Sequence, residues 1–132
     1  MNKKFVIIIV MVLMLIVLAT FEVLYAKETI NTIDNRLKQI QTDITISIDT
    51  NSDSGQILKN TSALLDYWNE RESVLCLMFN HNDMKDLGKE LTETKAYLEK
   101  EDLLEAYIHT KLAILQIESL RHIIQINFQN IL

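Results

Sequence analysis

Residues 5–21 form a continuous apolar run whose only polar member is Thr20, and this run strongly limits how the chain can fold. A helix needs about 20 apolar residues, within a range of about 17–25, to cross a hydrocarbon core roughly 30 Å thick. We therefore expect a signal-anchor or transmembrane helix over residues 1–26 and one further domain over residues 27–132. The residues expected to lie in the membrane include Phe5, Ile9, Leu13, Ile16 and Phe21.

Two lysines, Lys3 and Lys4, directly precede the apolar run. Because basic residues beside a span are retained in the cytoplasm, we expect a cytoplasmic N-terminus and an extracytoplasmic domain. The alternative is a cleaved signal peptide with Ala26 at the last position before the cut. Leu24 fits poorly at the third position before that cut, where a small residue is needed, so the sequence favours an uncleaved anchor.

The composition favours long helices. The sequence has no proline and only two glycines, Gly55 and Gly88, so it contains few helix breakers. Cys76 is the only cysteine, which excludes a disulfide within one chain and leaves an intermolecular disulfide open. The formal net charge of −5 argues against nucleic-acid binding and against a polybasic lipid-binding surface.

The first part of the expected domain carries an apolar seam with alternating spacings of three and four residues, which is a heptad pattern. Nothing between Tyr25 and the seam breaks a helix, so we expect one helix from about residue 4 to residue 48. Ile46 and Ile48 continue the seam with a strand-like alternation, but the heptad that leads into them favours a helix. The seam consists of Ile30, Ile33, Leu37, Ile40 and Ile44.

Three further helices are expected after a loop at residues 49–55. The first covers residues 56–79. The second begins after a turn at residues 80–83, with Asn82 as its cap, and is weakly apolar. The third covers about 103–129, with Asp102 as its cap. The remaining packing or interface residues are Trp68, Phe79, Leu112, Leu115, Ile124 and Phe128.

The fold prediction is therefore all-α. We expect a single N-terminal transmembrane helix that continues into an extracytoplasmic antiparallel bundle of three or four helices. The apolar last helix is expected to be central in the bundle or to lie in an oligomer interface. Surface ion pairs are expected between Arg71 and Glu70 or Glu72, and between Arg121 and Glu118.

Residues that might carry chemistry have simpler structural explanations. His81, Asp83 and Asp86 lie close in sequence, but the asparagine and aspartate residues at a helix start are explained by capping, and no metal-binding motif is present. Cys76 lies in an apolar helix, where a lone cysteine is more often a small core residue than a nucleophile. Trp68 with Tyr67 is more often a core anchor than a ligand pocket. We expect no catalytic residue, no metal and no cofactor.

Three features together resemble one protein family. They are the short N-terminal anchor, Trp68 followed by Glu70-Arg71 and the run 78–83 (Met-Phe-Asn-His-Asn-Asp), and the C-terminal run 129–132 (Gln-Asn-Ile-Leu). They resemble an uncharacterised Firmicutes family of short membrane-anchored helical proteins, described as a domain of unknown function. The resemblance implies a bacterial cell membrane location, a helical fold and an accessory role beside multi-span membrane proteins. It implies no activity.

The sequence thus predicts a non-enzymatic accessory or assembly protein of the cell envelope. It is expected to bind a multi-span membrane partner or a second copy of itself through helical packing. The heptad seam is one candidate surface for that contact, although so short a seam can instead pack within the bundle. The alternative function is a ligand-binding or sensory helical ectodomain that acts through a partner.

Overall fold

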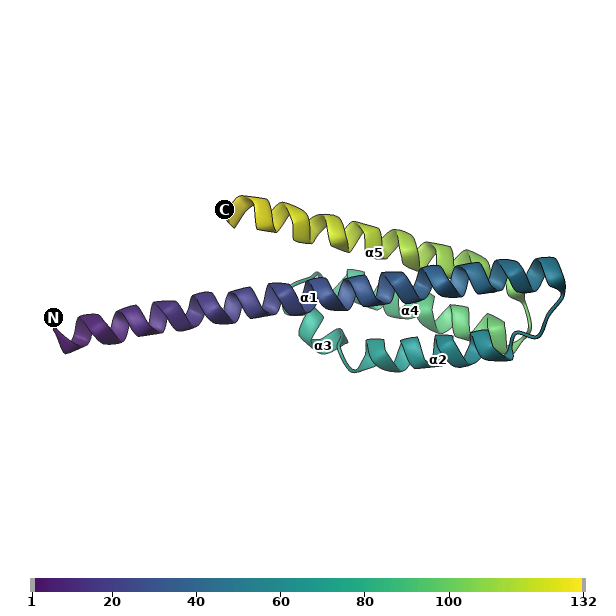
Figure 1. Ribbon diagram of the computed structural model, residues 1–132, viewed down its shortest axis with the longest axis horizontal. Helices are drawn as coiled ribbons and strands as arrows, with labels where there is room; N and C mark the ends of the chain where they lie inside the picture. Colours follow the sequence, from purple (N-terminus) through teal and green to yellow (C-terminus); the bar gives the residue numbers. More distant parts are fainter. Residues whose placement is uncertain (1, 132) are drawn as a thin grey trace.

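The computed structural model describes the backbone of residues 2–131 and the side chains of residues 2–126. The predicted all-α class is confirmed, since this part of the chain contains helices and no strand. The helices are α1 (Lys3–Thr50), α2 (Gly55–Asn69), α3 (Glu72–Leu75), α4 (His81–Glu99) and α5 (Leu103–Ile131). Figure 1 shows the first half of α1 projecting alone from a bundle that its second half forms with α2, α4 and α5.

α1 is a single unbroken helix of 48 residues, which corresponds to about 72 Å at 1.5 Å per residue. It begins after Asn2, whose side chain accepts a hydrogen bond from the backbone N–H of Lys4. It ends at Asn51, which adopts a left-handed conformation with φ of 51° and donates its N–H to the carbonyl of Ser47. The strand-like alternation at Ile46 and Ile48 therefore lies within a helix, as the heptad pattern predicted.

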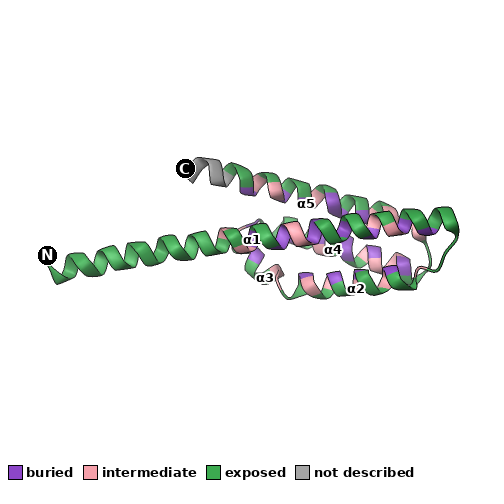
Figure 2. Cartoon of the chain, in the orientation of Figure 1, coloured by how far each residue is buried: buried purple, intermediate pink, exposed green. Residues whose placement is uncertain are grey.

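The core lies between the second half of α1 and the other long helices. Figure 2 shows the buried residues in this part of the chain, whereas the first half of α1 is exposed. α5 packs against both α1 and α4, while α2 packs against α4 and α1. In Figure 1, α1 and α4 run in one direction and α2 and α5 run in the other. All five residues of the heptad seam are buried in this core, namely Ile30, Ile33, Leu37, Ile40 and Ile44.

α5 turns an unexpected face to the core. Its buried residues include the small side chains Ala106, Thr110 and Ala113, followed by larger aliphatic ones toward its end as far as Ile124. Small side chains let two neighbouring helices approach closely, so α1 and α4 can both pack against α5. Leu112 and Leu115, which were predicted as packing or interface residues, lie on the opposite, exposed face and so do not pack in the core of the bundle. The side chain of Phe128 lies outside the described residues.

The predicted helix over residues 56–79 was wrong in one respect, because it is broken after Asn69. α2 ends there, and the short α3 follows in a new direction that carries Leu75 and then Phe79 back into the core. The Arg71 guanidinium stabilises the break, since it donates to the carbonyl of Tyr67 at 3.1 Å and leaves that helix end satisfied.

The ends of α4 and α5 follow capping rules. Asn80, not Asn82, is the cap of α4, and its side chain accepts the N–H of Asn82 at 2.9 Å. α4 is also more deeply packed than its weak apolar pattern suggested, with Met84, Leu87 and Leu91 all buried. Asp102 accepts the N–H of Glu105 at 3.2 Å at the start of α5, as the sequence predicted.

Candidate functional site

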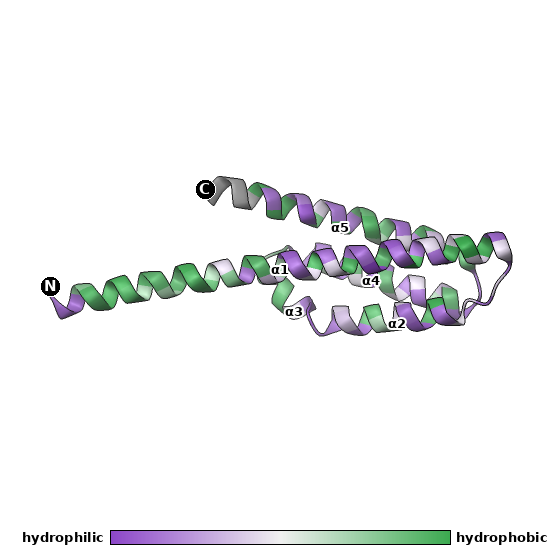
Figure 3. Cartoon of the chain, in the orientation of Figure 1, coloured by the Kyte–Doolittle hydropathy of each residue, from purple (hydrophilic) through white to green (hydrophobic). Residues whose placement is uncertain are grey.

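The first half of α1 has no packing partner among the described residues. The side chains expected in the membrane are all exposed, namely Phe5, Ile9, Leu13, Ile16 and Phe21. Figure 3 shows this half of α1 as an almost continuous hydrophobic rod, with Lys3 and Lys4 at its start. α1 is the one described helix that is long and apolar enough to cross a membrane, a property that a signal sequence near an N-terminus shares.

A buried ionic contact joins α1 to α5. The side chain of Asp34 is only 3% exposed, and its Oδ2 accepts hydrogen bonds from Arg121 of α5 at 2.6 Å and from Lys38 at 2.8 Å. Burial alone would raise the pKa of Asp34, but the hydrogen bonds and positive charges of Lys38 and Arg121 outweigh burial and hold this pKa below its ordinary value of 3.8. Asp34 therefore stays ionised and fixes the register between the two helices.

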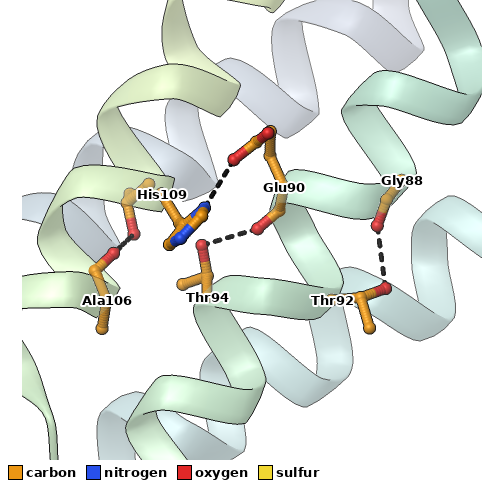
Figure 4. Close-up of polar contacts among 7 residues, drawn as sticks. Gly88, Glu90, Thr92, Thr94, Ala106 and His109 are labelled. Carbon is orange, nitrogen blue, oxygen red and sulfur yellow. Dashed lines mark hydrogen bonds and ion pairs between the residues drawn. The ribbon is translucent and has the colours of Figure 1, made fainter.

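A second polar contact joins α4 to α5, and Figure 4 shows it in close-up. The Nδ1 atom of His109 lies 2.6 Å from Oε2 of Glu90, and the Tyr97 ring stacks on the imidazole with centroids 5.2 Å apart. An ionised carboxylate only accepts hydrogen bonds, so Nδ1 carries the proton when Glu90 is ionised. Thr94 donates to the Glu90 carbonyl at 2.9 Å and so satisfies its own buried hydroxyl.

The residues considered for metal binding and nucleophilic chemistry do not form a site together. Among the residues whose side chains are described, no group of three or more histidine, cysteine or acidic residues could hold a metal ion. His81 instead lies 3.4 Å from the sulfur of Cys76, through Nδ1. Burial, followed by the nearby negative charge of Glu72, raises the pKa of Cys76 above 9.0 and keeps the thiol protonated. This environment is the opposite of one that activates a cysteine nucleophile.

Trp68 lies in the core rather than in a pocket. It is 1% exposed and packs directly on α4 at Gly88, where an added Cβ would lie 2.9 Å from Nε1 of the indole. Tyr67 lies at the helix surface, where two guanidinium groups cover its ring, Arg71 at 3.6 Å and Arg36 at 4.7 Å from the centroid. These contacts tie α2 to α1 at the level of Arg36.

The outer face of α5 carries an exposed apolar stripe. Leu112 is 40% exposed and Leu115 is 52% exposed, and both lie on the face that points away from α1 and α4. The spacings of four and three residues place the members of the stripe on one side of the helix. We define the α5 stripe as Leu104, Ile108, Leu112 and Leu115.

Two surface grooves combine size with polar groups, and one of them, of about 390 Å³, is lined by residues of α1 alone, among them Lys27, Glu28 and Asn31. A groove of about 320 Å³ lies between α1 and α2 and is lined by Arg36, Gln39, Ile40, Asn60 and Ala63. A space of about 60 Å³ lies between α4 and α5 and is lined in part by Asp83, Asp86 and Gln116. The grooves of about 320 Å³ and 390 Å³ both fall within the range of volumes typical of small-molecule sites, about 300–1,000 Å³.

The sequence reasoning missed both polar contacts between helices. Arg121 pairs with Asp34 across two helices instead of with Glu118 on its own helix. Asp34 directly follows the seam residue Ile33, and Glu90 lies between Leu87 and Leu91, so both occupy core-facing positions of their helices. Acidic residues at such positions are almost never buried unless paired, which was the available signal that a partner existed.

Comparison with known proteins identifies one family. A family model described as a domain of unknown function (DUF4363) matches residues 20–131 of the chain. No curated protein and no solved structure matches the chain. The resemblance to an uncharacterised family, which the sequence motifs suggested, is therefore confirmed.

Proposed function

The chain belongs to the DUF4363 family of unknown function, and we propose that it is a non-enzymatic, membrane-anchored accessory or assembly protein of the bacterial cell envelope. In this proposal residues 1–26 anchor the chain in the membrane of a Firmicutes bacterium. Lys3 and Lys4 stay in the cytoplasm, and residues 27–132 form an antiparallel helical bundle on the extracytoplasmic side. The exposed apolar half of α1 supports the anchor.

The α5 stripe is the observation that best supports the proposed assembly role. A helix in a small domain normally turns its large aliphatic side chains inward, yet the first part of α5 buries the small side chains Ala106, Thr110 and Ala113 while the larger side chains of the α5 stripe stay exposed. Contiguous exposed apolar surface on a soluble domain marks interaction sites. The heptad seam is buried within the chain and cannot serve this purpose. We propose that the α5 stripe packs against a helix of a multi-span membrane protein or against a second copy.

Purification of the full-length protein tests this role. The protein is crosslinked briefly in membranes, extracted in mild detergent, and read by mass spectrometry and intact mass. We expect a stoichiometric membrane partner or a defined homo-oligomer. The double variant Leu112→Ser with Leu115→Ser should lose it, because these exposed positions contribute to the stripe and not to the core.

The matched control is Lys111→Ser with Glu118→Ser, which changes two exposed polar positions of the same helix. This control should keep the partner or the oligomer. Both double variants should keep the buried-tryptophan fluorescence of Trp68, which reports an intact core. An unchanged partner set and oligomeric state in the leucine variant would refute the α5 stripe as the contact surface.

A ligand-binding ectodomain is the second candidate, and the groove between α1 and α2 favours it. Arg36, Gln39 and Asn60 place a cation and two amides around an apolar floor at Ile40, which is the usual chemistry of a small polar ligand site. A screen of small carboxylates against the full-length protein tests this function. A rise in melting temperature that disappears in the Arg36→Gln variant would support it over the assembly role.

A further inference from the structure

The two ends of the bundle differ in character. The end farthest from the apolar half of α1 is closed by polar loops, residues 51–54 and 100–102. The end nearest to it is formed by α3, by residues 76–80 and by the last turns of α5, as Figure 1 shows. We call this second end the basal end.

The basal end carries three exposed aliphatic side chains. Leu77 is 77% exposed, the largest value among the large hydrophobic side chains that the structure describes, and Val74 on α3 is 39% exposed. Ile126, near the end of α5, is 45% exposed. Leu75 and Phe79 of this end are buried in the core, so the exposed surface of Val74, Leu77 and Ile126 can contact something outside the bundle.

The geometry of α1 fixes how far the basal end lies from a membrane. Between Phe21, which ends the apolar run, and Ala26, the first buried residue of the bundle, α1 rises by about 7.5 Å. The headgroup layer on each side of the hydrocarbon core is about 5–8 Å thick. Because α1 is unbroken across this junction, no flexible linker separates the bundle from the bilayer surface.

The register of α5 against α1 also places the end of α5 near the bilayer surface. Arg121 lies beside Asp34, and α5 runs opposite to α1 for a further ten residues to Ile131. At equal rise per residue, Ile126 lies at about the level of residue 29 and the helix end at about the level of Leu24. The C-terminal end of α5 therefore lies about 4.5 Å above the level of Phe21, within the headgroup layer of about 5–8 Å.

We propose that the basal end, through Val74, Leu77 and Ile126, is a lipid-contacting surface that rests in the headgroup layer of the bilayer crossed by α1. The inference rests on the anchoring part of the proposed function and is independent of the α5 stripe. Apolar side chains gain free energy in the boundary between headgroups and acyl chains. The net acidic charge makes this contact hydrophobic rather than electrostatic. Two attachments, the span and the basal end, hold the bundle in one orientation above the membrane.

Lipid quenching of a site-specific fluorophore tests the proposal. The full-length protein carries Cys76→Ser, to remove the native thiol, and Leu77→Cys labelled with a thiol-reactive fluorophore. It is reconstituted into phosphatidylcholine vesicles with or without a lipid that bears a nitroxide at the headgroup boundary. The matched control is Leu104→Cys in the same background, because Leu104 is also an exposed leucine, at 64%, but is the second residue of α5, whose start lies at the far end of the bundle.

We expect the nitroxide lipid to remove about half or more of the emission at position 77, which lies within the roughly 5–10 Å depth of interfacial side chains, and little at position 104. Equal quenching at both positions would mean that the bundle lies flat on the membrane and would overturn the proposal. Absence of quenching at both, with protein that floats with the vesicles, would overturn it and leave the anchor intact; Leu77 would then contact a protein partner or water. Protein that fails to float would overturn the anchor as well.

Discussion

At the scale of single residues, the Asp34 carboxylate is the contact that sets how α5 lies on α1. The Asp34→Asn variant keeps the shape of the side chain but replaces charged hydrogen bonds with neutral ones. Hydrogen bonds to charged groups contribute about 1.5–3 kcal/mol each, and Arg121 is partly exposed and can recover some hydration. We therefore expect the variant to lose about 1–3 kcal/mol of unfolding free energy at pH 7, measured by urea unfolding in detergent through Trp68 fluorescence.

This loss should depend on pH with a definite sign. Because the pKa of Asp34 is lowered in the folded chain, its stabilising contribution is fully present above the ordinary value of 3.8 and disappears as pH falls through the folded pKa. The difference between wild type and Asp34→Asn should therefore shrink in acid. Asp49→Asn, at an exposed position of the same helix, should show no such difference. A wild-type advantage that stays constant below the folded pKa would contradict the ionic role of Asp34.

Glycine is needed at position 88 because the Trp68 side chain leaves no room for a Cβ, and not because of the backbone conformation there. Alanine at this helix position gains about 1 kcal/mol in helix propensity, but its Cβ would meet the Trp68 indole at 2.9 Å. Overpacking of a core costs about 1–3 kcal/mol, so we expect Gly88→Ala to destabilise the protein. Combining it with Trp68→Phe removes the clashing Nε1 atom, and a double-mutant cycle from melting temperatures should give a favourable coupling. Simple additivity of the two changes would contradict the steric explanation.

At the scale of helices, burial of the heptad seam means that a charge placed in it tests folding rather than partner binding. Leu37 is fully buried between helices, so Leu37→Asp would place an unpaired carboxylate in the core. Such a group costs several kcal/mol, against a total stability of about 5–15 kcal/mol for a domain. We expect the variant to lose its cooperative thermal transition, read by circular dichroism, whereas Gln39→Asp at an exposed position should not. Retained folding with loss of a partner would mean that the seam faces that partner.

The helices and the heptad seam were predictable from the sequence, because periodic aliphatic residues and the scarcity of helix breakers are features of neighbouring residues in the chain. The face of α5 was not, since its core residues Ala106, Thr110 and Ala113 carry little hydrophobic signal while its exposed leucines carry much. The break after Asn69 was missed for a related reason. It depends on Arg71 reaching the Tyr67 carbonyl and ring, and no periodicity records that contact. The ionic contact from Asp34 joins residues 87 positions apart, a separation that sequence spacing alone does not reveal.

At the scale of the whole molecule, our proposal makes α1 both the membrane span and a member of the bundle. In that arrangement one unbroken helix would fix the position and rotation of the domain relative to the membrane, and α5 runs back toward the membrane end of the bundle. In the proposed orientation the α5 stripe faces sideways, parallel to the bilayer, and the basal end faces the lipid. This arrangement suits lateral packing on the extramembrane part of a membrane partner better than capture of a partner from solution.

The length of α1 between span and bundle should therefore control contact with lipid. Seven helix-forming residues inserted after Glu22 would raise the bundle by about 10.5 Å with little net rotation, which exceeds the thickness of the headgroup layer, about 5–8 Å. We expect the quenching of a fluorophore at position 77 to disappear while Trp68 fluorescence stays unchanged. The same seven residues inserted within the polar loop 51–54 add equal length at the far end and should leave the quenching intact. Quenching that survives the first insertion would mean that the junction bends, so that the bundle is held at the surface by its own lipid contacts and not by a rigid α1.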